Sequence, residues 1–143
     1  MLFLGTFEHN LDDKLRLTIP SKFRNKVGQT VFVSKGFDGC LELRTLEAFE
    51  RWNSEISNHS TTSANARLIT REILANTSDV DVDNSGRIKI PANLLTIAGI
   101  KKTVLILGLG DRMEIWDSEK YHQYHNENNE NFEAVAEKLG GAN

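Results

Sequence analysis

The stretch DNSGRIKIP, from Asp83 to Pro91, repeats the pattern of an earlier stretch, DDKLRLTIP, from Asp12 to Pro20. Each has an Asp, three residues, an Arg, a short alternation of apolar and polar residues, and Ile-Pro. The similarity continues to residue 124 and, with small insertions, aligns Glu42 with Glu114. Two copies fall short of the ~3 repeats that a solenoid needs to bury a continuous core. The sequence therefore predicts two similar halves that fold against each other.

The alternation after each shared Asp predicts a half-buried strand. Leu17 and Ile19 would point to one face of the first such strand, because successive side chains of a strand alternate. Arg16 and Thr18 would point to the other face. The corresponding residues of the second half are Ile88 and Ile90 on one face, and Arg87 and Lys89 on the other. Each strand therefore combines an apolar face with a polar or basic one.

The residues around these strands predict turns and a short helix. The tetrapeptides DDKL and DNSG would form turns, with Asn84 and Gly86 able to adopt positive φ. Pro20 and Pro91 would stop strand pairing and open a short helix. The glycines in the position of a helix C-cap are Gly28 and Gly99.

The rest of each half predicts a second hairpin and a longer helix. Two apolar runs surround a glycine-rich turn at residues 31–43 and again at 104–116. Thr45 would cap a helix that extends to Ile56. The chain is therefore predicted to be α+β. Its expected parts are a first repeat at 1–56, a connecting loop and helix at 57–78, a second repeat at 79–125, and an amphipathic C-terminal helix at 126–143.

The C-terminal helix is predicted to have a narrow apolar stripe on an otherwise acidic surface. Its stripe residues recur at helical spacing and are Phe132, Val135, Ala136 and Leu139. Such a stripe needs a surface to cover, on its own subunit or on a neighbour.

Length and composition limit the possible classes of protein. The 143 residues are 39% hydrophobic and contain no apolar run that could cross a membrane, and the first residues lack the features of a secretory signal. We therefore expect a soluble, cytoplasmic protein. Cys40 is the single cysteine, cannot form an internal disulfide, and is expected to be a small buried residue in a reducing compartment.

Three motifs imitate ligand sites but lack a required residue. Residues 81–92 resemble a calcium loop, but Ala92 occupies the position of its bidentate Glu. Residues 108–113 begin like a dinucleotide fingerprint but lack its third glycine. One Glu and two His at 119–125 are too few ligands for a metal. With no plausible catalytic set either, we expect no enzyme, no metal and no cofactor.

Charge is segregated along the chain. The net charge of −3 argues against a general polyanion binder. Residues 14–35, however, contain six Lys and Arg and no Asp or Glu, whereas residues 111–143 contain eight acidic and three basic residues. A surface that attracts anions is therefore expected in the first half.

The Asp-x-x-x-Arg motif occurs as Asp12 with Arg16 and as Asp83 with Arg87. With the flanking Ile-Pro and the internal repeat, it resembles the MraZ family of bacterial transcriptional regulators over nearly the whole chain. The strand followed by a basic short helix is similar to the wider AbrB group of DNA-binding domains. The resemblance implies a swapped-hairpin, double-split β-barrel of two pseudo-symmetric halves with peripheral helices. It also implies a homo-oligomeric ring, taken as an octamer, and a nucleoid-associated regulator that binds short tandem repeats in the promoter of the division and cell-wall gene cluster. Activation and repression both stay open.

The expected interface uses arginine for bases and lysine for phosphates. Lys and Arg neutralise phosphates, while bidentate Arg contacts distinguish guanine in the major groove. Arg16 is assigned to bases or phosphates, and Arg24 to either, because it lies where AbrB-type domains have a DNA-contacting arginine. Lys14, Lys22 and Lys26 are assigned mainly to phosphates. The candidate DNA-binding residues are Arg16, Lys14, Lys22, Arg24, Lys26, Thr18, Arg87 and Lys89.

The second half departs from this pattern. Its short helix has no charge, and Asp79, Asp81 and Asp83 surround its turn. We therefore expect the first half to dominate DNA contact, with Arg87 and Lys89 available for subunit packing instead. A carboxylate beside a phosphate would repel it, so the motif aspartates are expected to hold their arginines and cap the turns. The residues assigned to structure are Asp12, Asp83, Pro20, Pro91 and Gly86.

The expected partners are double-stranded promoter DNA and further copies of the chain, with no membrane and no small-molecule substrate. An alternative function is an oligomeric ring scaffold whose basic patch binds an acidic protein without DNA specificity. A divalent-metal-dependent enzyme is a weaker alternative.

Overall fold

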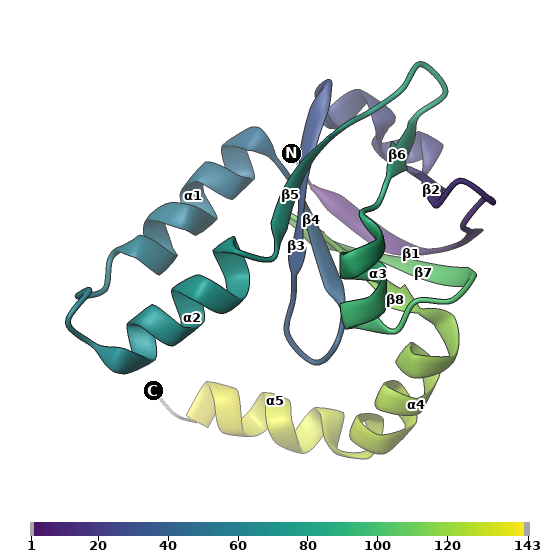
Figure 1. The fold of residues 1–143 in the computed structure, drawn as a ribbon. Helices are drawn as coiled ribbons and strands as arrows, with labels where there is room; N and C mark the ends of the chain where they lie inside the picture. The colour runs from purple at the N-terminus through teal and green to yellow at the C-terminus, as the bar shows by residue number, and fades with distance from the viewer. Residues whose placement is uncertain (1, 142–143) are drawn as a thin grey trace.

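The computed structural model describes residues 2–141 and shows a mixed α+β protein (Figure 1). The strands are β1 (Phe3–Asn10), β2 (Arg16–Thr18), β3 (Thr30–Lys35), β4 (Leu41–Thr45), β5 (Thr77–Asp81), β6 (Arg87–Lys89), β7 (Thr103–Gly110) and β8 (Met113–Asp117). The helices are α1 (Leu46–Ser57), α2 (Ala64–Leu74), α3 (Ala92–Ala98), α4 (Ser118–Asn128) and α5 (Phe132–Gly141), with 3-10 helices η1 (Ser21–Lys26) and η2 (Asn129–Asn131).

The two halves alternate within two antiparallel sheets. The larger sheet has the order β1-β7-β8-β4-β3-β5, and the smaller sheet pairs β2 with β6. At the centre of the larger sheet, β4 and β8 pair Glu42 with Glu114, the two residues that the repeat aligns. At the centre of the smaller sheet, Leu17 pairs with Ile88. A pseudo-twofold axis between these pairs therefore relates the halves.

Each half contributes strands to the other. The first strand of the chain, β1, pairs with β7 of the second half, and β5 pairs with β3 of the first half. After its turn, β2 pairs with β6. Because these ladders cross between the halves, the core belongs to both and forms only when they come together.

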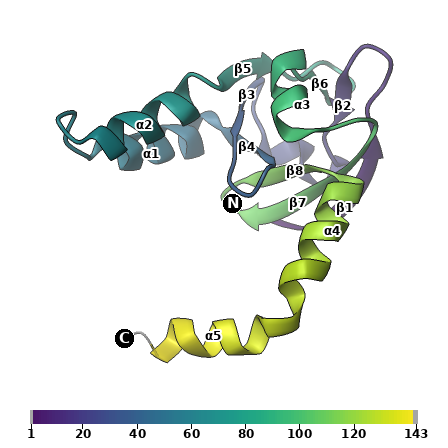
Figure 2. The same cartoon turned by 60° about the horizontal axis from the view of Figure 1, so that its bottom comes forward.

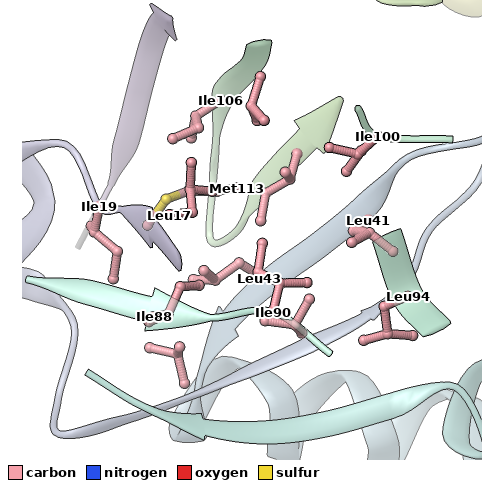
Figure 3. Close-up of a cluster of buried hydrophobic side chains, with 14 of the residues drawn as sticks. Leu17, Ile19, Leu41, Leu43, Ile88, Ile90, Leu94, Ile100, Ile106 and Met113 are labelled. Atoms are coloured by element: carbon pink, nitrogen blue, oxygen red, sulfur yellow. The ribbon is translucent and has the colours of Figure 1, made fainter. Parts of the chain in front are cut away.

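The core fills the space between the two sheets (Figure 3). Leu17 and Ile19 are buried, together with their counterparts Ile88 and Ile90, and this confirms the predicted apolar faces. Phe23 of η1 is also fully buried and packs edge-on against Phe3 and Phe7. Burying each such side chain contributes about 1.5–3 kcal/mol, so the strands are held by their apolar face while the opposite face stays available.

Two predicted helix boundaries are confirmed. The Thr45 hydroxyl accepts a hydrogen bond from the Ala48 N–H at 3.2 Å and caps α1. Helix α3 ends at Gly99, which has φ +63° and the left-handed conformation expected of a C-cap glycine.

The predicted helix and cap after Pro20 are wrong in detail. The segment is a 3-10 helix that ends at Val27 in an extended conformation, so Gly28 is not a left-handed cap. Only Phe23 of this segment is buried, whereas α3 buries Leu94, Leu95 and Ala98. The smaller buried face explains why an α-helix forms at one position and a tighter 3-10 helix at the other.

The second turn differs from the prediction at Asn84, and the first turn contains a positive φ that was not predicted. Gly86 has φ +77°, as predicted, but Asn84 does not have positive φ. In the first half the equivalent left-handed position is occupied by Leu15, with φ +62°. Leu15 packs against the core cluster, so burial of its side chain compensates for an unfavourable backbone conformation.

The remaining helices lie outside the sheets. Helices α1 and α2 lie side by side as a hairpin that projects from the larger sheet, and α4 leads to α5 at a distance from them (Figures 1 and 2). None of the helices in the described chain is both long and apolar enough to cross a membrane.

Candidate nucleic-acid interface

The first motif is a turn that is organised by one carboxylate. One oxygen of Asp12, Oδ1, accepts the backbone N–H of Lys14 at 2.9 Å and that of Arg16 at 2.8 Å. The other oxygen, Oδ2, accepts the Arg16 Nε–H at 2.7 Å. One residue therefore closes the turn and fixes the direction of the arginine side chain.

The second motif repeats this arrangement. Asp83 Oδ1 accepts the backbone N–H groups of Ser85 and Arg87, each at 2.9 Å. Its Oδ2 accepts the Arg87 Nε–H, also at 2.9 Å. The Asp-x-x-x-Arg motif thus forms the same structure in both halves, a capped turn with an oriented arginine.

Both aspartates have lowered pKa values. The Arg16 backbone N–H is the main cause of the low pKa of Asp12, and partial desolvation opposes it. The Arg87 backbone N–H has the same effect on the pKa of Asp83. Because the ordinary value is 3.8 for each, both carboxylates are ionised at neutral pH and hold their arginines by charge as well as by hydrogen bonds.

The pairing of β2 with β6 brings both arginines onto one surface, which we call the basic ribbon (Arg16–Thr18 and Arg87–Lys89). Arg16 lies opposite Lys89 and Thr18 opposite Arg87, on either side of the Leu17–Ile88 pair. Because that central pair is buried, its four neighbours point away from the core. The structure therefore brings together four of the eight predicted residues, two from each half.

The other four predicted residues come from the first half. Lys14 is exposed on the turn before β2, and Lys22 is exposed on η1. Arg24 donates from Nε to the Ile19 carbonyl at 3.1 Å, directly after β2. Lys26 instead faces the start of β1, where its Nζ donates to the Leu2 carbonyl at 2.9 Å. Lys14 thus lies at the Arg16–Lys89 end of the ribbon and Arg24 at the opposite end, beside the Gly86 turn, while Lys26 faces β1.

A contact between the halves explains why residue 86 is glycine. A side-chain carbon at Gly86 would lie 2.4 Å from Arg24 Nε and 2.7 Å from its Cδ, so Arg24 covers this turn closely. Sequence patterns suggested only the positive φ of Gly86 and missed its contact with Arg24. The aligned positions are Leu15, which packs against the core cluster, and Leu95, which belongs to it. The paired change from two leucines to Gly86 and Arg24 was the signal available in the sequence.

The two prolines have the same place in both halves. Pro20 and Pro91 lie at the N-caps of η1 and α3, with φ of −50° and −55°. The Pro20 carbonyl accepts the Phe23 N–H at 2.8 Å, and the Pro91 carbonyl accepts the Leu94 N–H at 3.0 Å. Each proline therefore ends its ribbon strand and starts the helix that flanks it.

Elsewhere the structure contains little that suggests a catalytic or metal site. Among the residues that it describes, no group of three or more His, Cys, Asp or Glu side chains could hold a metal ion. Burial raises the pKa of the Cys40 thiol far above its usual range, and the Glu114 and Glu42 carboxylates raise it further. A thiol that stays protonated is a poor nucleophile.

The fold and the ribbon together define a class of protein. It is a duplicated α+β protein in which two aspartate-anchored arginines, one from each half, share one exposed two-stranded ribbon. The family described as "MraZ protein, putative antitoxin-like" matches residues 2–72 and again residues 73–142, so each half matches it separately. The chain belongs to the MraZ family.

Similar proteins agree with this assignment. A "Transcriptional regulator MraZ" of Mesoplasma florum is 59% identical over 140 residues, which cover 97% of this chain and 96% of that protein. One from Mycoplasma mycoides is 45% identical over 134 residues, 94% of this chain and all of that protein. Another from Mycoplasmoides gallisepticum is 40% identical over 138 residues, 96% and 97% of the two chains. The matches cover nearly the full length of both partners.

Proposed function

We propose that this protein is a sequence-specific DNA-binding transcriptional regulator that contacts the duplex with its basic ribbon. The observation that carries the proposal is the alignment of Arg16, Thr18, Arg87 and Lys89 on one outward face of two paired strands. A major groove ~12 Å wide admits a two-stranded ribbon, and bidentate arginines there distinguish guanine from other bases. The names of the relatives, each a transcriptional regulator, support this role.

The motif aspartates orient the arginine side chains without occupying all of their hydrogen-bond donors. Each Asp engages the Nε–H of its Arg, which leaves the terminal nitrogens on the far side of the guanidinium for a second partner. The side chains of Arg16 and Arg87 are 28% and 34% exposed, so both can reach a ligand. An arginine with a fixed direction loses less conformational entropy on binding than a free one.

The flanking cations are proposed to contact phosphates. Lys14, Lys22 and Arg24 all come from the first half, with Lys14 and Arg24 at opposite ends of the ribbon, and the second half has Ser85, Asn93 and Leu95 at the aligned positions. Lys26 would join them only after releasing the Leu2 carbonyl. Affinity of a single protomer is expected to be low, because the chain as a whole has a net charge of −3.

Low affinity per protomer favours a multivalent assembly. We propose a homo-oligomeric ring, with eight copies as the working number, that binds short tandem repeats in the promoter of the division and cell-wall gene cluster. Linked weak contacts raise the effective concentration of each further contact, so that several protomers bind where one would not. The proposed location is the cytoplasm, at the nucleoid, with no enzymatic activity, cofactor or small-molecule substrate.

The proposed fold is a swapped-hairpin, double-split β-barrel. Its support is the exchange of strands between the halves, in which β1 pairs with β7, β5 with β3, and β2 with β6. Residues 1–56 and 79–125 would each form one repeat, joined by the segment 57–78 and followed by the helices at 126–143.

Selection of bound genomic fragments, followed by a gel-shift series at increasing salt, tests the function. We expect the selected fragments to contain short repeated elements and binding to weaken steeply as salt rises. Arg16→Ala and Arg87→Ala should each lower affinity about 5- to 150-fold, which corresponds to about 1–3 kcal/mol for a bidentate base contact. Arg51→Ala, at an exposed arginine on α1, is the matched control and should leave affinity unchanged.

Two results would contradict the proposal. The first is equal affinity for every fragment, which would favour the scaffold that binds an acidic protein. The second is an Arg51→Ala effect as large as that of Arg16→Ala, because binding would then reflect total charge rather than the ribbon.

A further inference from the structure

The loop between α3 and β7 contains two lysines that the internal repeat does not account for. Three residues separate Gly99 from β7, whereas only Gln29 separates Gly28 from β3. Two of the three are Lys101 and Lys102, and both are exposed. The second half therefore has two cations without an equivalent in the first half.

The backbone places Lys102 beside the first motif. Its carbonyl accepts the Leu11 N–H at 2.8 Å, which continues the pairing of β1 with β7 by one residue (Figure 1). Leu11 immediately precedes Asp12, the residue that orients Arg16. A lysine of the second half therefore lies next to the turn that presents the arginine of the first half.

The strand period gives the two lysines opposite directions. Val104 belongs to the core cluster between the sheets, whereas Leu105 belongs to a smaller cluster on the other face, under α4. Continued into the loop, this alternation places Lys102 on the face of Val104 and Lys101 on the opposite face. Leu11 agrees with this direction, because it lies across from Lys102 and belongs to the core cluster. Lys102 is therefore on the side of the larger sheet that the basic ribbon covers.

The Lys102 side chain is available to a ligand. Within the described residues, its ammonium takes part in no ion pair or hydrogen bond. In the neighbouring turn, Arg16 neutralises Asp12. Lys14 balances the charge of Asp13. Lys102 therefore adds a net positive charge beside this end of the ribbon.

Each motif turn has a cation from the opposite half beside it. Arg24 of the first half covers the second turn closely, and Lys102 of the second half lies beside the first turn. The two positions are not equivalent, because Arg24 aligns with Leu95. The counterpart of Lys102 is Gln29, whose carbonyl accepts the Val82 N–H at 2.9 Å. Different positions thus place a cation from the other half beside both arginine-bearing turns.

We propose that Lys102 contacts a backbone phosphate of the bound duplex beside the groove that Arg16 enters. An ammonium neutralises a phosphate as a point charge and does not distinguish bases. This inference rests on the proposed DNA binding and adds a contact from the second half to it. Each neutralised phosphate contributes about −0.9 to the slope of log K against log salt concentration, which corresponds to about 5-fold in affinity at about 0.15 M salt.

Lys102→Gln and Lys101→Gln in the full-length protein test the contact as a matched pair. They remove the same charge from adjacent exposed residues that face opposite sides of the sheet. Lys102→Gln should weaken binding about 5-fold at about 0.15 M salt and reduce the salt slope by about 0.9, whereas Lys101→Gln should change affinity by less than about 2-fold. The loss should be the same for a selected fragment and for an unrelated duplex, so that the ratio of the two affinities stays at the wild-type value. Unchanged melting curves show that both variants are folded.

Three results would overturn the assignment. Lys102→Gln could bind as tightly as the wild type, the two substitutions could weaken binding equally, or Lys102→Gln could lower the ratio of specific to non-specific affinity, which indicates a base contact. In each case a loss of affinity in Arg16→Ala would still support DNA binding by the ribbon. An unchanged affinity in Arg16→Ala would contradict the proposed function itself, so the two failures are distinguishable.

Discussion

Replacing Gly86 by alanine perturbs the contact between the two halves beside the ribbon. The new Cβ would be 2.4 Å from Arg24 Nε, so Arg24 must move and give up its 3.1 Å hydrogen bond to the Ile19 carbonyl. Gly86 also has φ +77°, where a side chain is disfavoured. The substitution therefore acts through the backbone and through Arg24 at once.

The two effects have separable magnitudes. A non-glycine residue in the left-handed region costs roughly 1–2 kcal/mol. Loss of a partly exposed hydrogen bond costs about 1 kcal/mol. Gly86→Ala should therefore lower the free energy of unfolding by about 2–3 kcal/mol. In Gly86→Ala/Arg24→Ala the hydrogen bond can be lost only once, so the double variant should be about 1 kcal/mol more stable than the sum of the single variants predicts.

Urea unfolding of the variants measures these differences, and Leu15 provides the matched control. Leu15 already has a side chain at φ +62° in the equivalent turn. Leu15→Ala and Leu15→Gly lose the same packing, but only glycine removes the backbone penalty, so Leu15→Gly should be more stable than Leu15→Ala by about 1 kcal/mol. A Gly86→Ala effect below about 0.5 kcal/mol, or strict additivity with Arg24→Ala, would refute the account of this contact.

Two further predictions concern charge. Because the pKa values of Asp12 and Asp83 are lowered on folding, these carboxylates stabilise the turns above pH 3.8, and this stability is lost as the pH falls through their folded-state pKa values. Both carboxyl groups should therefore titrate below 3.8 in an NMR pH series. Their titration should not change DNA affinity between pH 5 and 8. The buried Glu42 accepts the Arg44 Nη1–H at 2.6 Å, so Glu42→Gln should leave a buried charge unpaired and lower the free energy of unfolding by about 3–5 kcal/mol in a urea titration. Glu114→Gln, at the paired position, should change the free energy of unfolding by less than about 1 kcal/mol, because a glutamine oxygen can still accept the Trp116 indole N–H that Glu114 accepts. Equal effects of the two substitutions would contradict the conclusion that only Glu42 compensates a buried charge.

Local features of this fold were predictable from the sequence because they depend on neighbouring residues. The alternation in RLTI and RIKI predicted which residues are buried, and Leu17 and Ile88 are buried as the period of a strand requires. Thr45 and Gly99 marked helix ends through a hydroxyl acceptor and a left-handed conformation. The Asp-x-x-x-Arg spacing gave the candidate site its two arginines.

Features that depend on contacts between the halves were not predictable from local patterns. The register that places Arg16 opposite Lys89 is set by the burial of Leu17 against Ile88, which lie far apart in the chain. Leu15 adopts positive φ although local preference disfavours it, because its side chain packs against the core. The short segment after Pro20 became a 3-10 helix because the core accepts only Phe23 from it.

Duplication within one chain gives the ribbon a direction that a symmetric dimer of one repeat could not have. The pseudo-twofold axis relates Arg16 to Arg87, but the flanks differ, since Lys14, Lys22 and Arg24 correspond to Ser85, Asn93 and Leu95. Phosphate contacts made by cations that occur in one half only would orient each protomer on the duplex. A protomer with unequal flanks would distinguish the two directions of a DNA element, whereas a symmetric ribbon would fit an element equally well in either direction. Reversing one element of a repeated site should therefore weaken binding in a gel shift, and equal affinity for both arrangements would contradict the asymmetry.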